Sequence, residues 1–341
     1  PCEEAAGHGD ASPPNPPRLG AFLAESQQVV DLQAYWTARQ GSEHAWLGSL
    51  LDLLDAEAAG MNLARELLDD WKASAVPAAA FALADVQLLS PIPRPRSIRD
   101  CLAFEAHLQN ATATMVRWRS RTAGLIDRTM RRWLRRPLVG IPAVWYERPI
   151  YYKSNPGSVV GPEADIVWPG YTERLDYELE FGVYIGRRGK DIAAEAAADY
   201  IAGYAIFNDF SARDIQAREM QGRLGPAKSK DFDTGNAIGP YLVTPDELPD
   251  PHNLEMTARV NGEVGSAGNS RDMHFSFAQI VAYISQDETL YPGDFIGSGT
   301  VGSGCGLELD RWIQPGDVIE LEVAGLGILR NRIVRKAAAA D

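Results

Sequence analysis

Residues 175–186 have the sequence LDYELEFGVYIG, and this alternating stretch decides the fold class. Every second position carries an apolar side chain, namely Leu175, Tyr177, Leu179, Phe181, Val183 and Ile185. Successive side chains of a β-strand point to opposite faces, so the pattern predicts a strand with one apolar face. Asp176, Glu178 and Glu180 then share the other face. The stretch therefore predicts a sheet that carries carboxylates on its polar side.

The sequence from residue 143 onward predicts further strands around this one. An example is DVIELEVAGLGILRNRIV at 317–334, and turn signals such as NG and PGD separate the strands. Short helices are interspersed, but strands and helices do not alternate regularly, which argues against a Rossmann or TIM architecture. We find no internal repeat. We therefore expect a mixed α/β, β-rich fold.

Three regions are expected along the chain. Residues 1–18 contain five prolines and few apolar side chains, so we expect a flexible Pro-rich tail. Residues 19–90 are expected to form a small N-terminal domain, with a strand-like start followed by helices of three- and four-residue apolar spacing. Prolines at 91–95 indicate an extended linker at the start of a larger domain over 91–341. Residues 99–118 predict a helix.

The composition is that of a globular protein, because 45% of the 341 residues are hydrophobic and 23% are charged. A net charge of −13 argues against nucleic acid as a partner. No apolar run reaches the roughly 18 residues of a membrane span, so we expect no membrane partner. The acidic start lacks the features of a signal peptide. Three widely spaced cysteines fit a reducing compartment, and we expect a cytoplasmic protein.

Residues 117–136 form a strongly basic segment with eight arginines and one acid, Asp127. Apolar side chains, among them Leu125 and Trp133, give it an apolar side. A solvated helix face is the simpler interpretation. A lid or a subunit contact that draws in an anionic substrate is the functional alternative.

Three carboxylates in the second half of the chain suggest a metal site. Glu178 and Glu180 lie two apart on one strand face, where a divalent cation would relieve their repulsion. Such pairs also occur by chance on solvated strands, and that alternative stays open. Asp209 adds a third carboxylate in FNDFSARDIQ, at the end of a predicted strand and just before a helix. Carboxylates without Cys or His favour Mg²⁺, Mn²⁺ or Ca²⁺.

Other polar side chains near these acids have both a functional and a structural interpretation. Arg213 and Gln216 lie three apart on a predicted helix, where they bind a carboxylate or simply face solvent. Lys230 lies in the loop GPAKSKDF, either reaching an anion or solvated. Thr300 lies in the Gly-rich GSGTVGSG and offers a hydroxyl to a carboxylate. His107, one of five histidines, is as compatible with packing as with chemistry.

Taken together and in this order, seven stretches resemble the fumarylacetoacetate hydrolase family. They cover roughly residues 90–335 and are RSIRDCLAFEAHLQNA, LDYELEFGVYIG, FNDFSARDIQAREM, GPAKSKDF, IGPYLVTPDEL, LYPGDFIGSGTVGSGCGLEL and PGDVIELEVAGLGILRN. The resemblance implies that residues 91–341 form a catalytic domain with the mixed β-sandwich roll of that family. It also implies a homodimer, and it makes residues 19–90 the variable N-terminal domain.

The resemblance implies a site for one Mg²⁺ or Mn²⁺. Its ligands would be Asp100, Glu178, Glu180 and Asp209. Asp100 enters this set through the resemblance alone, since its position in the sequence carries no spacing signal.

The resemblance also assigns roles to the other candidates. His107 matches the catalytic histidine, and Glu308 matches the glutamate that orients it. The residues that match contacts to substrate oxygens and to the carbanion-like leaving group are Arg213, Gln216 and Lys230. Thr300 matches a contact to the substrate carboxylate.

These matches lead us to expect a Mg²⁺-dependent enzyme that hydrolyses a C–C bond in a β-diketo acid such as fumarylacetoacetate or an acylpyruvate. His107 would remove a proton from water. Isomerases and decarboxylases of 2-hydroxy-dienoates or oxaloacetate use the same metal site and remain alternatives. A binding protein without turnover, with residues 117–136 as its contact surface, is the alternative from another class. The intact His107 and Glu308 argue against it.

Overall fold

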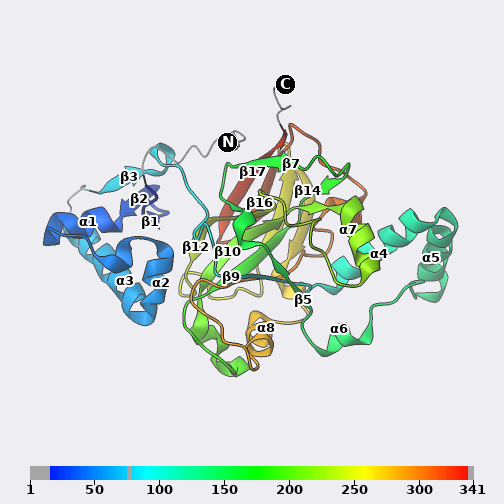
Figure 1. Ribbon diagram of the computed structural model, residues 1–341, viewed down its shortest axis with the longest axis horizontal. Coiled ribbons are helices and arrows are strands. Elements are labelled where there is room, and N and C mark those ends of the chain that lie inside the picture. Colours follow the sequence, from blue (N-terminus) through cyan, green and yellow to red (C-terminus); the bar gives the residue numbers. More distant parts are fainter. Residues whose placement is uncertain (1–15, 75–78, 337–341) are drawn as a thin grey trace, which may run out of the picture. The chain divides into compact units, whose positions relative to one another are not determined.

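The computed structural model describes residues 16–74 and 79–336, which fall into two compact units, Pro1–Gln87 and Leu88–Asp341 (Figure 1). The division lies three residues before the boundary expected from the sequence. Residues 1–15 of the expected tail lie outside the described residues. Each unit has its own hydrophobic cluster, so each is described by itself.

In its described part, the first unit is a small three-stranded antiparallel sheet with three α-helices. The strands β1 (Gly20–Leu23), β2 (Gln28–Asp31) and β3 (Ala80–Ala82) follow one another in the sheet. The helices are α1 (Leu32–Gln40), α2 (Leu50–Asp55) and α3 (Glu57–Ser74). The Asp31 carboxylate accepts from the Ala34 amide and starts α1 where the strand ends. The core of this unit is apolar, and residues 16–74 and 79–87 contain no group of metal-ligating side chains of the kind found in the second unit.

The second unit is strand-rich and mixed, as the sequence predicts. Its larger sheet has the order β5-β4-β15-β9-β10-β12-β6. In that order the bounds are Tyr151–Ser154, Ile98–Cys101, Phe295–Gly297, Glu180–Ile185, Ile201–Asp209, Asn236–Val243 and Val159–Val160. The β15–β4 and β12–β6 pairs are parallel and the others antiparallel.

A second sheet has the order β14-β13-β16-β17-β7. Its bounds are Glu263–Asn269, Glu255–Val260, Val318–Val323, Gly327–Arg335 and Asp165–Trp168. A short pair joins β8 (Leu175–Asp176) to β11 (Ser211–Ala212). The helices are α4 (Glu105–Arg119), α5 (Arg121–Leu134), α6 (Ala143–Glu147), α7 (Arg213–Glu219), α8 (Phe277–Ile284) and α9 (Gly306–Leu309). Across both units, the 3₁₀ turns of the described residues are Ala45–Leu47, Leu83–Asp85, Pro156–Ser158, Ala194–Tyr200, Met220–Gly222 and Ser270–Asp272.

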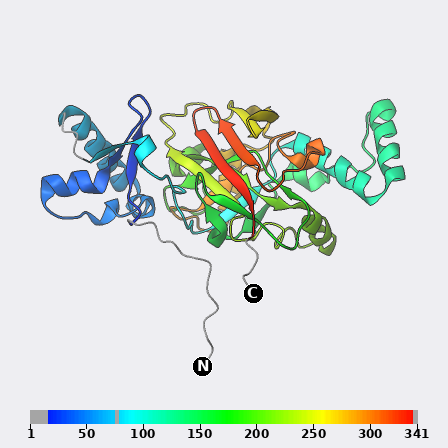
Figure 2. The same cartoon turned by 90° about the horizontal axis from the view of Figure 1, so that it is seen from above.

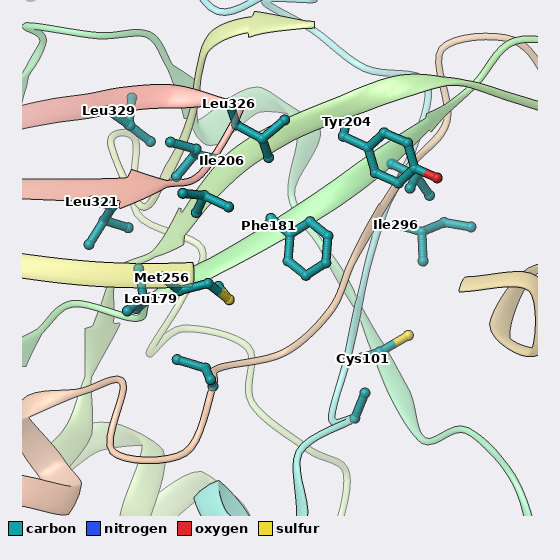
Figure 3. Packing of buried hydrophobic residues seen from close by; sticks show 14 of the residues in the cluster. Cys101, Leu179, Phe181, Tyr204, Ile206, Met256, Ile296, Leu321, Leu326 and Leu329 are labelled. Carbon is teal, nitrogen blue, oxygen red and sulfur yellow. The ribbon is translucent and has the colours of Figure 1, made fainter. Parts of the chain in front are cut away.

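The core of the second unit lies between the two sheets. Figure 3 shows Phe181 and Ile206 from the larger sheet facing Met256, Leu321 and Leu329 from the smaller one. All five side chains are buried. Burying side chains of this size stabilises a fold by about 1.5–3 kcal/mol each, so the apolar positions of the alternating stretch hold the two sheets together.

The predicted strand over 175–186 is interrupted. Its start is β8, its end is β9, and Glu178 between them makes a single antiparallel bridge to Cys305. The side chain of Asn208 supports the interruption by accepting from the Glu178 amide at 3.0 Å. Both faces of the stretch are buried, with Glu178 4% exposed and Glu180 fully covered. The solvated strand face is therefore excluded as an explanation of these acids.

The helix predicted over residues 99–118 begins later than expected. Residues Ile98–Cys101 form β4, which lies between β5 and β15 in the larger sheet, and α4 starts at Glu105. The apolar and buried Ile98 and Cys101 match a central strand. Because the helix begins at Glu105, Asp100 lies on a strand that neighbours β15, and His107 lies in the first turn of the helix.

The basic segment forms a helical hairpin. Ser120 ends α4 and caps α5, which lies beside α4 in both views (Figures 1 and 2). The Asp127 side chain binds Arg131 and the Leu138 amide. The arginines on the outer face are exposed, in agreement with a solvated helix face, but Leu125 and Trp133 are also 63% and 74% exposed.

Candidate metal centre and catalytic dyad

Buried carboxylates meet where three strands of the larger sheet come together. One carboxylate oxygen from each of Asp100, Glu178 and Glu180 lies within 4.8 Å of the others. Asp100 comes from β4 and Glu180 begins β9, with only β15 between the two strands. Gly297 of β15 leaves the space for this approach, because a Cβ there would lie 2.5 Å from Asp100 Oδ1. The sheet order thus brings together acids that are far apart in sequence.

Two buried cations bind these acids. Lys230 Nζ donates to Glu178 Oε2 at 2.7 Å and also to Asp209 Oδ2, which joins Asp209 at the end of β10 to the group. Arg213 Nη2 lies 2.8 Å from Glu178 Oε1. Tyr152 also donates its hydroxyl to Asp209 Oδ2. The loop lysine predicted as solvated or anion-binding is therefore fully inside the cluster.

The pKa values of the acids diverge according to their partners. Burial, together with repulsion from the neighbouring acids, holds the pKa values of Asp100 and Glu180 well above their usual range. Burial also raises the pKa of Asp209 to about 6, although Lys230 opposes the shift. For Glu178, burial alone would raise the pKa, but Lys230 and Arg213 outweigh it and bring the pKa well below its usual range.

The donor set fits a hard divalent cation. Asp100 Oδ1 and Asp209 Oδ1 are buried and have no hydrogen-bond partner among the described residues. Buried polar atoms of this kind require an explanation, and a bound ion is one. Carboxylate oxygens are the ligands that Mg²⁺ and Mn²⁺ prefer. The residues predicted as metal ligands thus lie together, with three of them in one group and Asp209 linked through Lys230.

A histidine–glutamate pair lies beside the carboxylates. His107 Nδ1 is 2.8 Å from Glu308 Oε1. Glu308 also accepts from Asn110 Nδ2 at 3.0 Å and from the Ser303 amide at 2.8 Å. With Glu308 ionised, Nδ1 carries the proton and Nε2 is left to accept one. The two residues are 201 positions apart in the sequence, and the packing of α4 against α9 brings their side chains together.

Two predicted substrate contacts are engaged within the protein. The Thr300 hydroxyl donates to Glu180 Oε1 at 3.0 Å, and the Gly299 amide donates to Glu180 Oε2 at 3.1 Å. Thr300 therefore positions a candidate metal ligand in this structure. Gln216 Oε1 accepts from Arg213 Nη1 at 3.0 Å and orients the guanidinium.

Asp176 is a buried residue of the site that the sequence analysis did not select. Its Oδ1 accepts from the Gly306 amide at 2.8 Å, and its Oδ2 accepts from the Leu307 amide at 2.9 Å and from Arg213 Nε at 2.8 Å. It thereby ties the start of α9, which carries Glu308, to the arginine of α7. The signal was present, since Asp176 continues the alternating acids of Glu178 and Glu180. Tyr152 was also missed, and nothing in its sequence context would have indicated it.

Cys305 lies next to the dyad but is not a candidate nucleophile. Its Sγ donates to Glu308 Oε1 at 3.5 Å, and the residue is fully buried. Burial raises the pKa of this thiol well above its usual range, although Arg213 opposes the shift. Thiolate is the nucleophilic form, so this cysteine stays protonated.

The carboxylate cluster predicts a pH-dependent response to Mg²⁺. When folding raises the pKa of a carboxyl, that carboxyl stabilises the fold at pH values below its pKa in the unfolded chain, which is about 4. This stability is lost as the pH rises through the pKa of the carboxyl in the folded protein. For Asp209 that folded value is about 6. Mg²⁺ binds the ionised carboxylates, so the increase in Tm caused by excess Mg²⁺ over EDTA should be larger at about pH 8 than at about pH 5. Equal increases at the two pH values in thermal unfolding would contradict this assignment.

Comparisons with known proteins agree with the geometry. The chain matches the family model described as fumarylacetoacetate (FAA) hydrolase C-terminal over residues 126–334. It is 40% identical over 191 residues to human oxaloacetate tautomerase FAHD2A, mitochondrial, an alignment of 55% of this chain and 60% of that relative. The chain thus spans about three fifths of the length of this curated relative.

Solved structures show the same fold. A 2-hydroxyhepta-2,4-diene-1,7-dioate isomerase from Mycobacterium marinum is 30% identical with a TM-score of 0.57, covering 76% of this chain and 82% of that one. A fumarylacetoacetate hydrolase from Exiguobacterium antarcticum is 25% identical with a TM-score of 0.67, covering 94% and 95%. The expected family fold is confirmed. Within the described residues, no helix has both the length and the apolar character needed to cross a membrane. Because the family model covers more than half of the chain, and solved structures that include a fumarylacetoacetate hydrolase share its fold, the chain belongs to the fumarylacetoacetate hydrolase family.

Proposed function

We propose that the protein is a Mg²⁺-dependent hydrolase that cleaves a C–C bond in a β-diketo acid. The observation that carries the proposal is the buried His107–Glu308 pair beside the carboxylate cluster. The two parts are connected, because Glu178 forms a backbone bridge with Cys305, three residues before Glu308. When it is protonated, His107 also helps to lower the pKa of Glu178, behind Lys230 and Arg213. A base therefore lies within electrostatic reach of the proposed metal ligands.

A divalent cation bound by Asp100, Glu178, Glu180 and Asp209 would supply a Lewis acid and a template for the oxygens of a 2-oxo acid. The chain's own residues supply proton transfer and charge. His107 Nε2 takes a proton from water, and Glu308 stabilises the resulting imidazolium through Nδ1. The water oxygen bonds to the distal carbonyl carbon, and the C–C bond breaks with its electron pair on the 2-oxo acid fragment.

The cations of the site stabilise that fragment. Lys230 and Arg213 place two buried positive charges at the carboxylate cluster, where the negative charge of an enolate would develop. Protonation of the enolate carbon by His107 then returns the proton taken from water. For an acylpyruvate, the products are a carboxylic acid and pyruvate, so the atoms of substrate and water are all accounted for.

A keto–enol tautomerase is the second candidate. The similarity to the human oxaloacetate tautomerase favours it, as does the similarity to the isomerase from Mycobacterium marinum. In that reaction His107 would take its proton from the substrate carbon rather than from water. A decarboxylase would use the same groups. A homodimer and a cytoplasmic location stay predictions.

A turnover assay separates these reactions. A panel of acylpyruvates and oxaloacetate is incubated with the protein in Mg²⁺ or in EDTA, and the products are identified by NMR. We expect a carboxylic acid plus pyruvate in Mg²⁺, and loss of turnover both with EDTA and with Glu180→Ala. Glu173→Ala, which removes an exposed acid near the site, should keep full turnover. A tautomer or carbon dioxide as the sole product would overturn hydrolysis in favour of the second candidate or of decarboxylation.

A further inference from the structure

Three side chains with different donor atoms converge beside the carboxylate cluster. Donor atoms of His107, Cys305 and Glu308 all lie within 4.8 Å of one another. Glu308 Oε1 is at the centre, 2.8 Å from His107 Nδ1 and 3.5 Å from Cys305 Sγ. They come from α4, from the residue that precedes α9, and from α9 itself. The group therefore offers one nitrogen, one sulfur and one oxygen to a single point.

The spacing suits a tetrahedral metal ion. Zinc bonds of about 2.0–2.3 Å to N, O and S place neighbouring ligand atoms roughly 3.3–3.6 Å apart. The Sγ–Oε1 separation already has this value, and the Nδ1–Oε1 separation has to open by only a few tenths of an ångström. All three side chains are now held together by two shared protons, one between the His107 imidazole and Glu308 and one between the Cys305 thiol and Glu308. Three protein ligands also leave a fourth position open for water.

The ligand chemistry distinguishes this group from the carboxylates. Thiolate and imidazole favour Zn²⁺ and the similar d¹⁰ ion Cd²⁺, whereas Mg²⁺ prefers oxygen ligands and retains water. The cluster of Asp100, Glu178 and Glu180 offers only oxygen atoms as ligands. Two neighbouring groups thus have opposite metal preferences, and they are joined at the Glu178–Cys305 bridge.

We propose that His107, Cys305 and Glu308 form a binding site for Zn²⁺ or another thiophilic divalent cation, separate from the oxygen-ligand site. Occupation takes the imidazole and the carboxylate out of proton transfer, because the proton on Nδ1 moves to Nε2 when Nδ1 binds the cation. It also releases the thiol proton of Cys305 to solvent. The inhibition of turnover by the bound cation rests on the proposed function, but the existence of the binding site does not. The cation enters at His107, the least covered of the three side chains at 8% exposed.

Binding is measured with Cd²⁺ on the full chain in a Cys2→Ser background, so that Cys101 and Cys305 are the thiols present. We expect one equivalent of Cd²⁺ to produce ultraviolet sulfur-to-cadmium charge transfer that excess Mg²⁺ does not abolish. Cys305→Ser keeps a hydroxyl donor for Glu308 and should lose this absorbance. Cys101→Ser, which changes the other buried free thiol, should retain it.

A second variant tests the nitrogen ligand. His107→Gln should weaken Cd²⁺ binding at least on the order of tenfold, the lower end of what losing even an outer partner of a metal ligand costs. Thermal unfolding of each variant shows that it is folded. Charge transfer that persists in Cys305→Ser, disappears in Cys101→Ser, or is equally strong in His107→Gln would overturn the site.

Inhibition is measured separately, on any substrate that the panel identifies. Zn²⁺ in the presence of excess Mg²⁺ should inhibit the parent protein at concentrations about tenfold or more below those that inhibit Cys305→Ser. Equal inhibition would place the effect at the carboxylates and overturn the inhibitory role. If the panel gives no turnover, the proposed function fails, while the Cd²⁺ absorbance still decides the site.

Discussion

Glu308→Gln should lower kcat by about 10³–10⁴-fold, the size of loss seen when a carboxylate that orients a catalytic histidine becomes its amide. The carboxylate accepts from His107 Nδ1, Asn110 Nδ2 and the Ser303 amide. An amide retains the shape but provides one acceptor oxygen and adds a donor, so the tautomer with the proton on Nδ1 is no longer fixed. The imidazolium also loses the charge that stabilises it. Steady-state kinetics on the substrate identified by the panel measure the effect.

The split between kcat and KM distinguishes positioning from a general loss of structure. Glu308 is not one of the four carboxylates proposed to bind Mg²⁺, so KM and the increase in Tm with Mg²⁺ should change little. Glu308→Asp should restore part of kcat, because the carboxylate is retained. Asp310→Asn, an exposed acid two residues away, is the matched control and should keep full activity. Unchanged kcat in Glu308→Gln would remove Glu308 from the mechanism.

The sequence predicts the parts of this site that follow local periodicity. Glu178 and Glu180 are two apart in an alternating stretch, and their shared face follows from strand geometry alone. Their burial does not follow, because it depends on what covers that face, and residues 298–306 provide part of this cover from far along the chain. The same non-local packing interrupts the strand at Glu178, which no periodicity predicts.

The remaining members of the site depend on sheet order and loop position. Asp100 joins the group because β15 lies between β4 and β9 and pairs with both, an arrangement that the spacing of residues in the sequence cannot show. Only the family resemblance selected it, together with His107 and Glu308. Lys230 lies in a loop, where the sequence fits a solvated side chain as well as one that reaches an anion. In the structure Lys230 donates to Glu178 and Asp209, and these two contacts place it inside the site.

Asp176→Asn should destabilise the fold by about 3–5 kcal/mol, the cost of breaking a buried ion pair by removing one partner. Both residues of the pair with Arg213 are buried, at 0% and 2% side-chain exposure. The aspartate accepts three hydrogen bonds, from the Gly306 and Leu307 amides and from Arg213 Nε. An asparagine has one acceptor oxygen, so its amide group must face at least one of these N–H donors. Urea unfolding measures the loss, with Asp165→Asn as control.

The control isolates the effect of burial. Asp165 also pairs with an arginine, at 3.2 Å from Arg332 Nε, but both side chains are about half exposed. Exposed pairs of this kind contribute about 0–1 kcal/mol, so Asp165→Asn should change stability by no more than that. Asp176→Asn should also lower kcat, since the start of α9 that it anchors carries Glu308. Equal small losses of stability in the two variants would show that Asp176 does not hold the arginine and α9 together, and that Gln216 and Glu178 suffice to place Arg213.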